Sequence, residues 1–393
     1  MLLRIAPSLL RRGRDGEVRQ EEQTVVQFDV TRGGRAEMIK TALCDMLGIE
    51  YPLIQGPMGP FDTSDLAPAV SNAGGLGIIS HHLPTDTPAL MLGGDRQRGA
   101  IEEVEEIEVR AIHKVNRLTD KNFGQNFRAS GTRQPDVPYL IEAMLEEREK
   151  NPELKKKFKL FISSAGDPAQ PHLRRVKDYG MLWFCVVASA YHAKRAEDLG
   201  VDGIIAVGNE AGGHIGAAPF STLTLIPEVV EAVKVPVVAG GGICDGKGFA
   251  AALALGAQGV YMASRFIPTK EMTAHQNLKE YFIKAGEKYR REAATIVTEG
   301  LYGPCRHVKN KYALELYELT EKERRGEATL EDVLRYETPR MFRAAGDGEV
   351  DEGPIWGSEV ARRVHKIQET KEVIEEIIRE ASEVIKGLQG LVK

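Results

Sequence analysis

The residues with the clearest chemical potential lie around His214. Residues 210–216 read EAGGHIG, so two glycines precede this histidine and leave it on an open turn. A neutral imidazole near pH 7 can accept or give a proton. We therefore expect His214 to act in acid–base chemistry or to hold a polar group of a substrate, and loop ordering is the alternative.

Glycines are concentrated in the same part of the chain, where residues 203–259 hold 12 of the 40. The turn Gly240–Gly242 follows one apolar run, and Ala263-Ser264-Arg265 follows the next. Bare backbone N–H groups in such turns can approach an anion closely. Two turns of this kind, together with the histidine turn, predict a phosphate site rather than simple turn geometry.

Eight short apolar runs carry these turns at their ends. They cover residues 52–58, 76–80, 122–127, 160–165, 182–188, 203–208, 236–242 and 259–264, with helical patterns between them. This alternation predicts an α/β fold, the (β/α)8 TIM barrel, whose chemistry lies at the carboxyl ends of the strands. A doubly wound open sheet is the alternative, but it needs a GxGxxG turn after the first strand, where this chain has QGPMGPF.

We expect three regions along the chain. Residues 1–37 are basic at first and then polar and patternless, which indicates a disordered extension rather than a targeting peptide. Residues 38–270 form the barrel core. Residues 271–393 are rich in charge and predict a helical lid and a C-terminal helical extension that completes the barrel. Within the core, residues 128–158 predict a helical insertion, with the third helix and a longer loop over the site.

Composition and charge exclude several classes of protein. The net charge of −5 argues against a general nucleic-acid binder. The uncharged run between Lys247 and Arg265 is too short and too glycine-broken to span a membrane. The four cysteines form no CxxC pair, and no histidine or carboxylate spacing indicates a metal site. We expect a cytoplasmic enzyme with a small-molecule substrate, and the sequence leaves a homodimer open.

Several longer segments resemble the nitronate monooxygenase (2-nitropropane dioxygenase) family. They are YPLIQGPM, SNAGGLGIIS, LTDKNFGQN, AKRAEDLGVDGIIAVGNEAGGHIG and VPVVAGGGICDGKGFAAALALGAQGVYMASRF, all within residues 38–270. The family also contains flavin-dependent enoyl-ACP reductases and some flavin NAD(P)H:quinone reductases. The resemblance implies a TIM barrel that binds FMN.

The resemblance also implies roles for single residues. The turn after the first strand would contact the flavin ring, as would Asn126 and the glycine pair before His214, and the turns after strands seven and eight would bind the phosphate. The implied cofactor-binding residues are Gln55, Gly56, Pro57, Met58, Asn126, Gly212, Gly213, Gly241, Gly242, Ala263 and Ser264. Val207 and Tyr261 depart from the family, in which a polar residue is frequent at the first position and Gln at the second.

The expected reaction is oxidation of an alkyl nitronate with O2, in which His214 holds or deprotonates the substrate. The main alternative is NAD(P)H-dependent reduction of an enoyl thioester or a quinone at the same site, and EAGGHIG and LTDKNFG lean toward it. A flavin-sequestering or regulatory barrel is a third hypothesis. Anaerobic reduction of the flavin by each candidate donor separates the three.

Other polar residues are weaker candidates. His192 follows the fifth strand and could contribute to the site or lie on a solvated helix surface. His81 and His82 follow the second strand and could face the site or belong to a plain loop. Cys185 and Cys244 have no adjacent activating base and are interpreted as packing residues. Glu210 is interpreted as a residue that orders its loop.

Overall fold

Eight parallel strands form a barrel in the computed structural model, which describes residues 39–59, 61–82, 98–129, 136–300 and 303–391. They pair in the order β1-β9-β8-β6-β5-β4-β3-β2. Each of them overlaps one of the eight predicted apolar runs, so the (β/α)8 prediction is confirmed. Their bounds are β1 (Leu53–Gln55), β2 (Gly77–Ile79), β3 (Phe123–Arg128), β4 (Phe158–Ser164), β5 (Leu182–Val187), β6 (Gly203–Val207), β8 (Val237–Gly240) and β9 (Gly259–Met262).

Hydrogen bonds between β1 and the residue before β2 close the remaining seam. Leu76 donates its N–H to the carbonyl of Leu53 at 2.8 Å, and Gln55 donates its N–H to the carbonyl of Leu76 at 3.0 Å. The Gln55 side chain continues this ladder, because its Oε1 accepts the N–H of Ile78 at 2.9 Å. The buried Gln55 side chain is therefore part of the seam.

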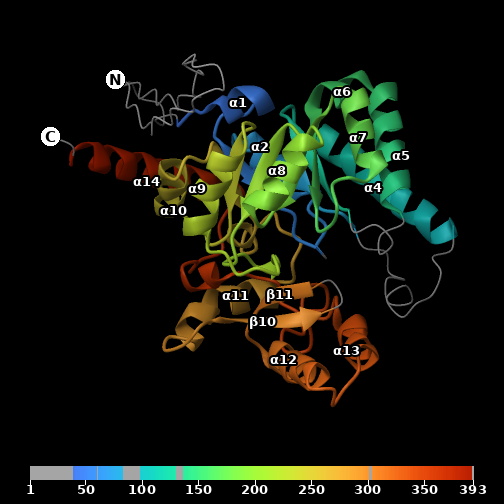
Figure 1. Ribbon diagram of the computed structural model, residues 1–393, viewed down its shortest axis with the longest axis vertical. Coiled ribbons are helices and arrows are strands. Elements are labelled where there is room, and N and C mark those ends of the chain that lie inside the picture. Colours follow the sequence, from blue (N-terminus) through green and yellow to red (C-terminus); the bar gives the residue numbers. More distant parts are fainter. Residues whose placement is uncertain (1–38, 60, 83–97, 130–135, 301–302, 392–393) are drawn as a thin grey trace, which may run out of the picture.

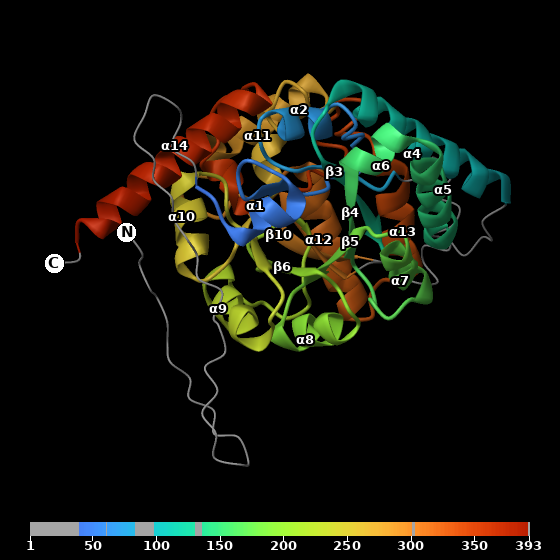
Figure 2. The same ribbon diagram turned by 90° about the horizontal axis from the view of Figure 1, so that it is seen from above.

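Apolar side chains fill the barrel. Alternate strand residues point inward, and their cluster includes Ile54, Ile78, Ile162, Phe184, Ile205 and Val238. Helix α1 (Ala42–Leu47) adds Leu43 and Leu47 to this cluster and lies across one end of the barrel in Figure 2. Since the interior is packed, a ligand site has to lie at the strand ends.

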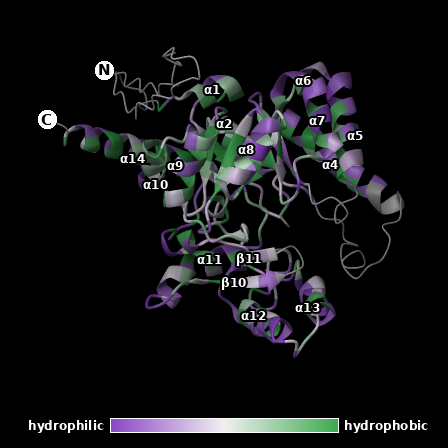
Figure 3. Cartoon of the chain, viewed as in Figure 1, coloured by the Kyte–Doolittle hydropathy of each residue, from purple (hydrophilic) through white to green (hydrophobic). Residues whose placement is uncertain are grey.

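Helices surround the barrel and bury their apolar faces on it (Figures 2 and 3). The third helix predicted in residues 128–158 is present as α5, and a short helix, α6, follows it. The last helix, α14, packs beside α10 and α2 and so occupies the position of the eighth helix. The bounds are α2 (Leu66–Asn72), α4 (Arg98–Leu118), α5 (Val137–Lys150), α6 (Pro152–Lys157), α7 (Pro171–Asp178), α8 (Ala190–Asp198), α9 (Thr222–Ala232), α10 (Gly246–Ala254) and α14 (Thr370–Gln389).

Residues 271–369, called the lid below, form a second layer at the carboxyl ends of the strands (Figure 1). The lid contains α11 (Gln276–Lys288), α12 (Lys311–Arg324) and α13 (Leu330–Glu337), as the sequence predicted. It also contains an antiparallel hairpin of β10 (Thr295–Gly300) and β11 (Gly303–Val308), which the sequence analysis did not predict. The short strand β7 (Gly213–His214) leaves the barrel and pairs with β11. The predicted extension at residues 1–37 lies outside the described residues.

Candidate active site

Four backbone N–H groups at the ends of β8 and β9 have no acceptor within the described part of the chain. They belong to Gly241, Gly242, Ala263 and Ser264, all predicted phosphate-binding residues. Gly241 and Gly242 have φ angles of 96° and 70°, a region that favours glycine. Because β8 and β9 are neighbours, the two turns lie side by side. Unpaired N–H groups at a barrel mouth suit a phosphate or another anion.

The lid packs directly on these turns. The Ser264 hydroxyl accepts the N–H of Ser358 at 3.1 Å, which leaves its own O–H able to donate. A Cβ atom on Gly212 would lie 2.3 Å from the carbonyl carbon of Gly357, so no side chain fits there. The lid backbone at residues 357–358 thus touches both the glycine turn before His214 and the turn after β9.

The other predicted cofactor turns meet at the same mouth. A Cβ atom on Gly56 would lie 3.1 Å from the Cβ of Ala263, and one on Gly241 would lie 2.8 Å from the carbonyl oxygen of Gly208. Next to Gly56, Pro57 is half-buried and Met58 is buried, and Met58 donates its N–H to Ser80 Oγ at 2.8 Å. The turns after β1, β6, β8 and β9 are therefore in mutual contact.

Asn126, a predicted cofactor-binding residue, lies on the interior face of β3. Its Nδ2 donates to the carbonyl of Ile162 at 3.1 Å and to Ser164 Oγ at 3.2 Å. Because side chains alternate along a strand, Arg128 shares this face and lies nearer the mouth. Arg128 was not singled out from the sequence, although its spacing of two from Asn126 was a usable indication.

His214 is held by the lid rather than by the barrel. It lies opposite Cys305 in the β7–β11 pair, and the next residue, Ile215, donates its N–H to the carbonyl of Pro304 at 3.0 Å. The His214 ring is half-buried, 6.3 Å from the Trp356 ring. Burial, with a smaller contribution from the charge of Arg128, lowers the pKa of His214 to about 3. The imidazole is therefore neutral at physiological pH, and its N–H can donate a hydrogen bond.

A second histidine, missed by the sequence analysis, lies behind His214. His307 is two residues beyond Cys305 on β11 and thus on the same face of the hairpin. It is buried, and its Nε2 shares a hydrogen bond of 3.1 Å with Thr298 Oγ1. Burial, with a smaller contribution from His214, lowers the pKa of His307 to about 3. No local pattern marked His307, because it approaches His214 only through the pairing of β11 with β7.

The two departures from the family pattern, Val207 and Tyr261, lie inside the barrel near its mouth. The Tyr261 ring occupies space left by two glycines: a Cβ on Gly56 would lie 3.3 Å from it, and one on Gly240 would lie 3.4 Å from it. The Tyr261 hydroxyl is buried and has no hydrogen-bond partner among the described residues. Burial raises the pKa of Tyr261 far above its usual value, so the phenol stays protonated.

The weaker candidates have structural explanations. Glu210 accepts the N–H of Thr222 at 2.9 Å and its hydroxyl at 2.8 Å, so it orders the start of α9. His192 is exposed on α8. Cys185 and Cys244 are buried, and burial raises the pKa of each thiol to about 11, which does not suit a nucleophile.

Two further properties concern metals and membranes. Among the residues that the structure describes, no group of three or more His, Cys, Asp or Glu side chains is arranged to hold a metal ion. In the same residues, no helix combines the length and apolar character needed to cross a bilayer.

The fold is a TIM barrel whose strand ends carry glycine turns and a histidine that the lid holds. The chain belongs to the nitronate monooxygenase family, whose sequence model matches residues 40–380. It is therefore an oxidoreductase, and this membership implies a flavin cofactor.

Proteins with three different names are among those similar to this chain. FabK from Thermotoga maritima has a similar structure, with a TM-score of 0.74 and 32% identity over 90% of this chain and 100% of its own. A "(3aS,4S,5R,7aS)-5-hydroxy-7a-methyl-1-oxo-octahydro-1H-indene-4-carboxyl-CoA dehydrogenase" of Rhodococcus jostii (strain RHA1) is 36% identical over 63% of this chain, and the match spans 61% of that protein's length. A "Probable nitronate monooxygenase" of Staphylococcus aureus (strain MSSA476) is 29% identical over 70% of this chain and 80% of its own.

Proposed function

We propose that the protein is an FMN-dependent oxidoreductase that acts on an acyl thioester, with NAD(P)H as its redox partner. The observation that carries this proposal is the position of His214, which the pairing of β7 with β11 holds beside the barrel mouth. A neutral N–H donor suits a thioester carbonyl oxygen, which gains negative charge as the adjacent carbon–carbon bond is reduced. The name of the Rhodococcus relative, a carboxyl-CoA dehydrogenase, supports this class of substrate.

The residues at the mouth fit FMN. The four unpaired N–H groups after β8 and β9 and the hydroxyl of Ser264 form a donor set for its phosphate. The turn after β1, Asn126 and the glycine pair before His214 would hold the rest of the cofactor. When bound, the flavin supplies the electron-transfer chemistry, and the protein supplies binding, orientation and electrostatics.

The protein's own part is to orient the substrate and exclude water. His214 would hold the substrate oxygen through its N–H. Arg128, on the face of Asn126, would add positive charge beside that oxygen. The lid, which touches the turns through Gly357 and Ser358, would cover the reacting groups and strengthen both interactions by excluding water.

Nitronate oxidation, the reaction favoured by the sequence analysis, is the second candidate. A nitronate is already an anion, so His214 and Arg128 could hold its oxygens without removing a proton. The Staphylococcus relative, named a probable nitronate monooxygenase, supports this candidate. Thioester reduction is preferred because the Rhodococcus carboxyl-CoA dehydrogenase is 36% identical to this chain, whereas the Staphylococcus protein is 29% identical.

An anaerobic assay distinguishes the candidates. We expect NADH or NADPH to bleach the bound flavin and an enoyl thioester such as crotonyl-CoA to restore its absorbance. Reduction by propionate 3-nitronate, with no response to NAD(P)H, would instead establish nitronate oxidation. If neither donor reacts while FMN stays bound, the protein is a flavin-binding barrel rather than a catalyst for these reactions.

A further inference from the structure

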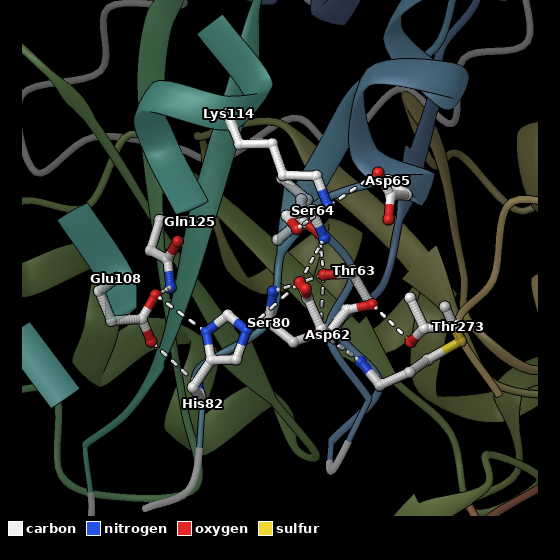
Figure 4. A network of polar contacts seen from close by, with 12 residues as sticks. Asp62, Thr63, Ser64, Asp65, Ser80, His82, Glu108, Lys114, Gln125 and Thr273 are labelled. Atoms are coloured by element: carbon white, nitrogen blue, oxygen red, sulfur yellow. Dashed lines mark hydrogen bonds and ion pairs between the residues drawn. The ribbon is translucent and has the colours of Figure 1, made fainter. Parts of the chain in front are cut away.

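His82 lies between two carboxylates at the edge of the barrel mouth (Figure 4). Its Nε2 lies 3.3 Å from Asp62 Oδ1, and its Nδ1 lies 3.3 Å from Glu108 Oε2. The backbone N–H of His82 also donates to Glu108 Oε1 at 2.8 Å. Asp62, His82 and Glu108 are called the carboxylate clamp below.

Glu108 and His82 of the clamp are shielded from solvent. Glu108 is completely buried, and the His82 side chain keeps 14% of its surface exposed. Burial opposes a charge on His82, but the carboxylates of Glu108 and Asp62 outweigh it and raise the pKa of His82 to about 10. The imidazole is therefore a cation at neutral pH. A buried carboxylate such as Glu108 requires such a partner, because an unpaired buried charge is strongly destabilising.

The clamp joins segments that are far apart in the sequence. Asp62 precedes α2, His82 follows β2 and Glu108 lies on α4. From β3, Gln125 donates its Nε2 to Glu108 Oε2 at 3.1 Å. From the lid, the hydroxyl of Thr273 donates to the carbonyl of Asp62 at 2.8 Å. The clamp thus links the segment after β1, the segment after β2, helix α4, strand β3 and the lid.

Two of the linked segments carry predicted cofactor residues. Ser80, two residues before His82, accepts the N–H of Met58 at 2.8 Å and donates its own N–H to Thr63 Oγ1 at 2.7 Å. Thr63 in turn adjoins Asp62. Gln125 directly precedes Asn126. The turn after β1 is therefore joined to the clamp by the hydrogen bond between Met58 and Ser80. Asn126 is joined to it through the hydrogen bond between its neighbour Gln125 and Glu108.

We propose that His82 is a positioning residue for the cofactor: its imidazolium sets the turn after β1 and the carboxyl end of β3 at the separation that FMN binding requires. This inference rests on the proposed function, because FMN is the ligand whose site is positioned. The competing explanation is a clamp that stabilises the fold and has no effect on the cofactor site.

The test uses the double variant H82Q/E108Q in the full-length protein. The single variant H82Q leaves Glu108 buried without its cation and is expected to lower the melting temperature of the apoprotein. Replacing both residues removes the unpaired charge, so the double variant should melt within about 3 °C of the wild-type apoprotein. We expect it nevertheless to bind FMN about tenfold or more weakly, because hydrogen bonds to charged groups are lost beside the site.

A matched control is H113Q. His113 also lies on α4 and pairs with a carboxylate, Glu147 Oε2, at 3.1 Å, but both side chains are partly exposed and lie on the outer helices α4 and α5. H113Q should keep wild-type FMN affinity. Wild-type FMN affinity in H82Q/E108Q would overturn the inference and leave the proposed function intact. Failure of the wild-type protein itself to bind FMN would overturn both.

Discussion

Cys305 lies directly opposite His214 across the antiparallel pair of β11 and β7. His214, the residue proposed to hold the substrate, is thus positioned by a strand whose paired residue lies 91 positions further along the chain. In the proposed function, the lid is therefore part of the active site as well as its cover.

Because Cys305 lies opposite His214, its thiol could take part in the reaction, and the variant C305A tests this hypothesis. Burial raises the pKa of the Cys305 thiol well above its usual value, so the thiol stays protonated and is a poor nucleophile. We expect C305A to retain turnover within about threefold, with a stability loss of about 1 kcal/mol from the lost packing. A loss of turnover of about a hundredfold or more would show that the thiol takes part in the reaction.

The buried histidine His307 predicts a specific acid sensitivity. Its folded-state pKa of about 3 lies below the unfolded value near 6.5, so the unfolded chain binds more protons between these values. Stability from this group is fully present above about pH 6.5 and is lost as the pH falls toward 3.

The expected slope for one such group is about 1.4 kcal/mol per pH unit. Urea denaturation between pH 7 and pH 4.5 measures it, and H307N should show a shallower decline than the wild-type protein. Identical slopes would mean that His307 is protonated in the folded state.

The anion-binding turn can be tested through Gly241. A Cβ at this position would lie 2.8 Å from the carbonyl oxygen of Gly208, and the φ of 96° is strained for alanine. We expect G241A to weaken FMN binding about tenfold or more, because the unpaired N–H groups move. G180A is the matched control: Gly180 has φ 65° with no atom within 4 Å of its Cβ position, so it tests backbone strain alone. Equal FMN affinity in the two variants would place the phosphate elsewhere.

Tyr261 offers a test of the unpaired hydroxyl. The Tyr261 O–H is buried and has no partner among the described residues, so its removal relieves a desolvation cost. Y261F should therefore leave the apoprotein as stable as the wild type or raise its unfolding free energy by about 1 kcal/mol. Y139F, which removes a hydroxyl from an exposed side chain on α5, is the control and should change nothing. A clear loss of stability in Y261F would reveal a partner for the hydroxyl.

The barrel could be predicted because its information is local. Runs such as residues 203–208 and 236–242 are apolar throughout, Gly200 follows the helix before the first of them, and every predicted run contains a strand. The hairpin was missed because the surrounding residues are highly charged, although the β-branched residues of TIVTEG and the glycine after them were strand and turn indications.

The placement of the proposed phosphate-binding turns was predictable, because it depends on the backbone. The turns of Gly241 and Ser264 meet because parallel strands end together, and this follows from the fold alone. The partners of His214 and His82 were not predictable. Cys305 and Glu108 reach them through strand pairing and helix packing, and no local spacing encodes either contact.

The most direct test of the account is to measure the two half-reactions separately in H214A. FMN should remain bound, and NAD(P)H should reduce it at close to the wild-type rate, since His214 holds the thioester and not the nucleotide. Reoxidation by crotonyl-CoA should slow by about 10²–10³, the usual cost of removing one donor to a developing oxyanion. Reoxidation at the wild-type rate would contradict the central claim that the lid-held His214 activates the substrate.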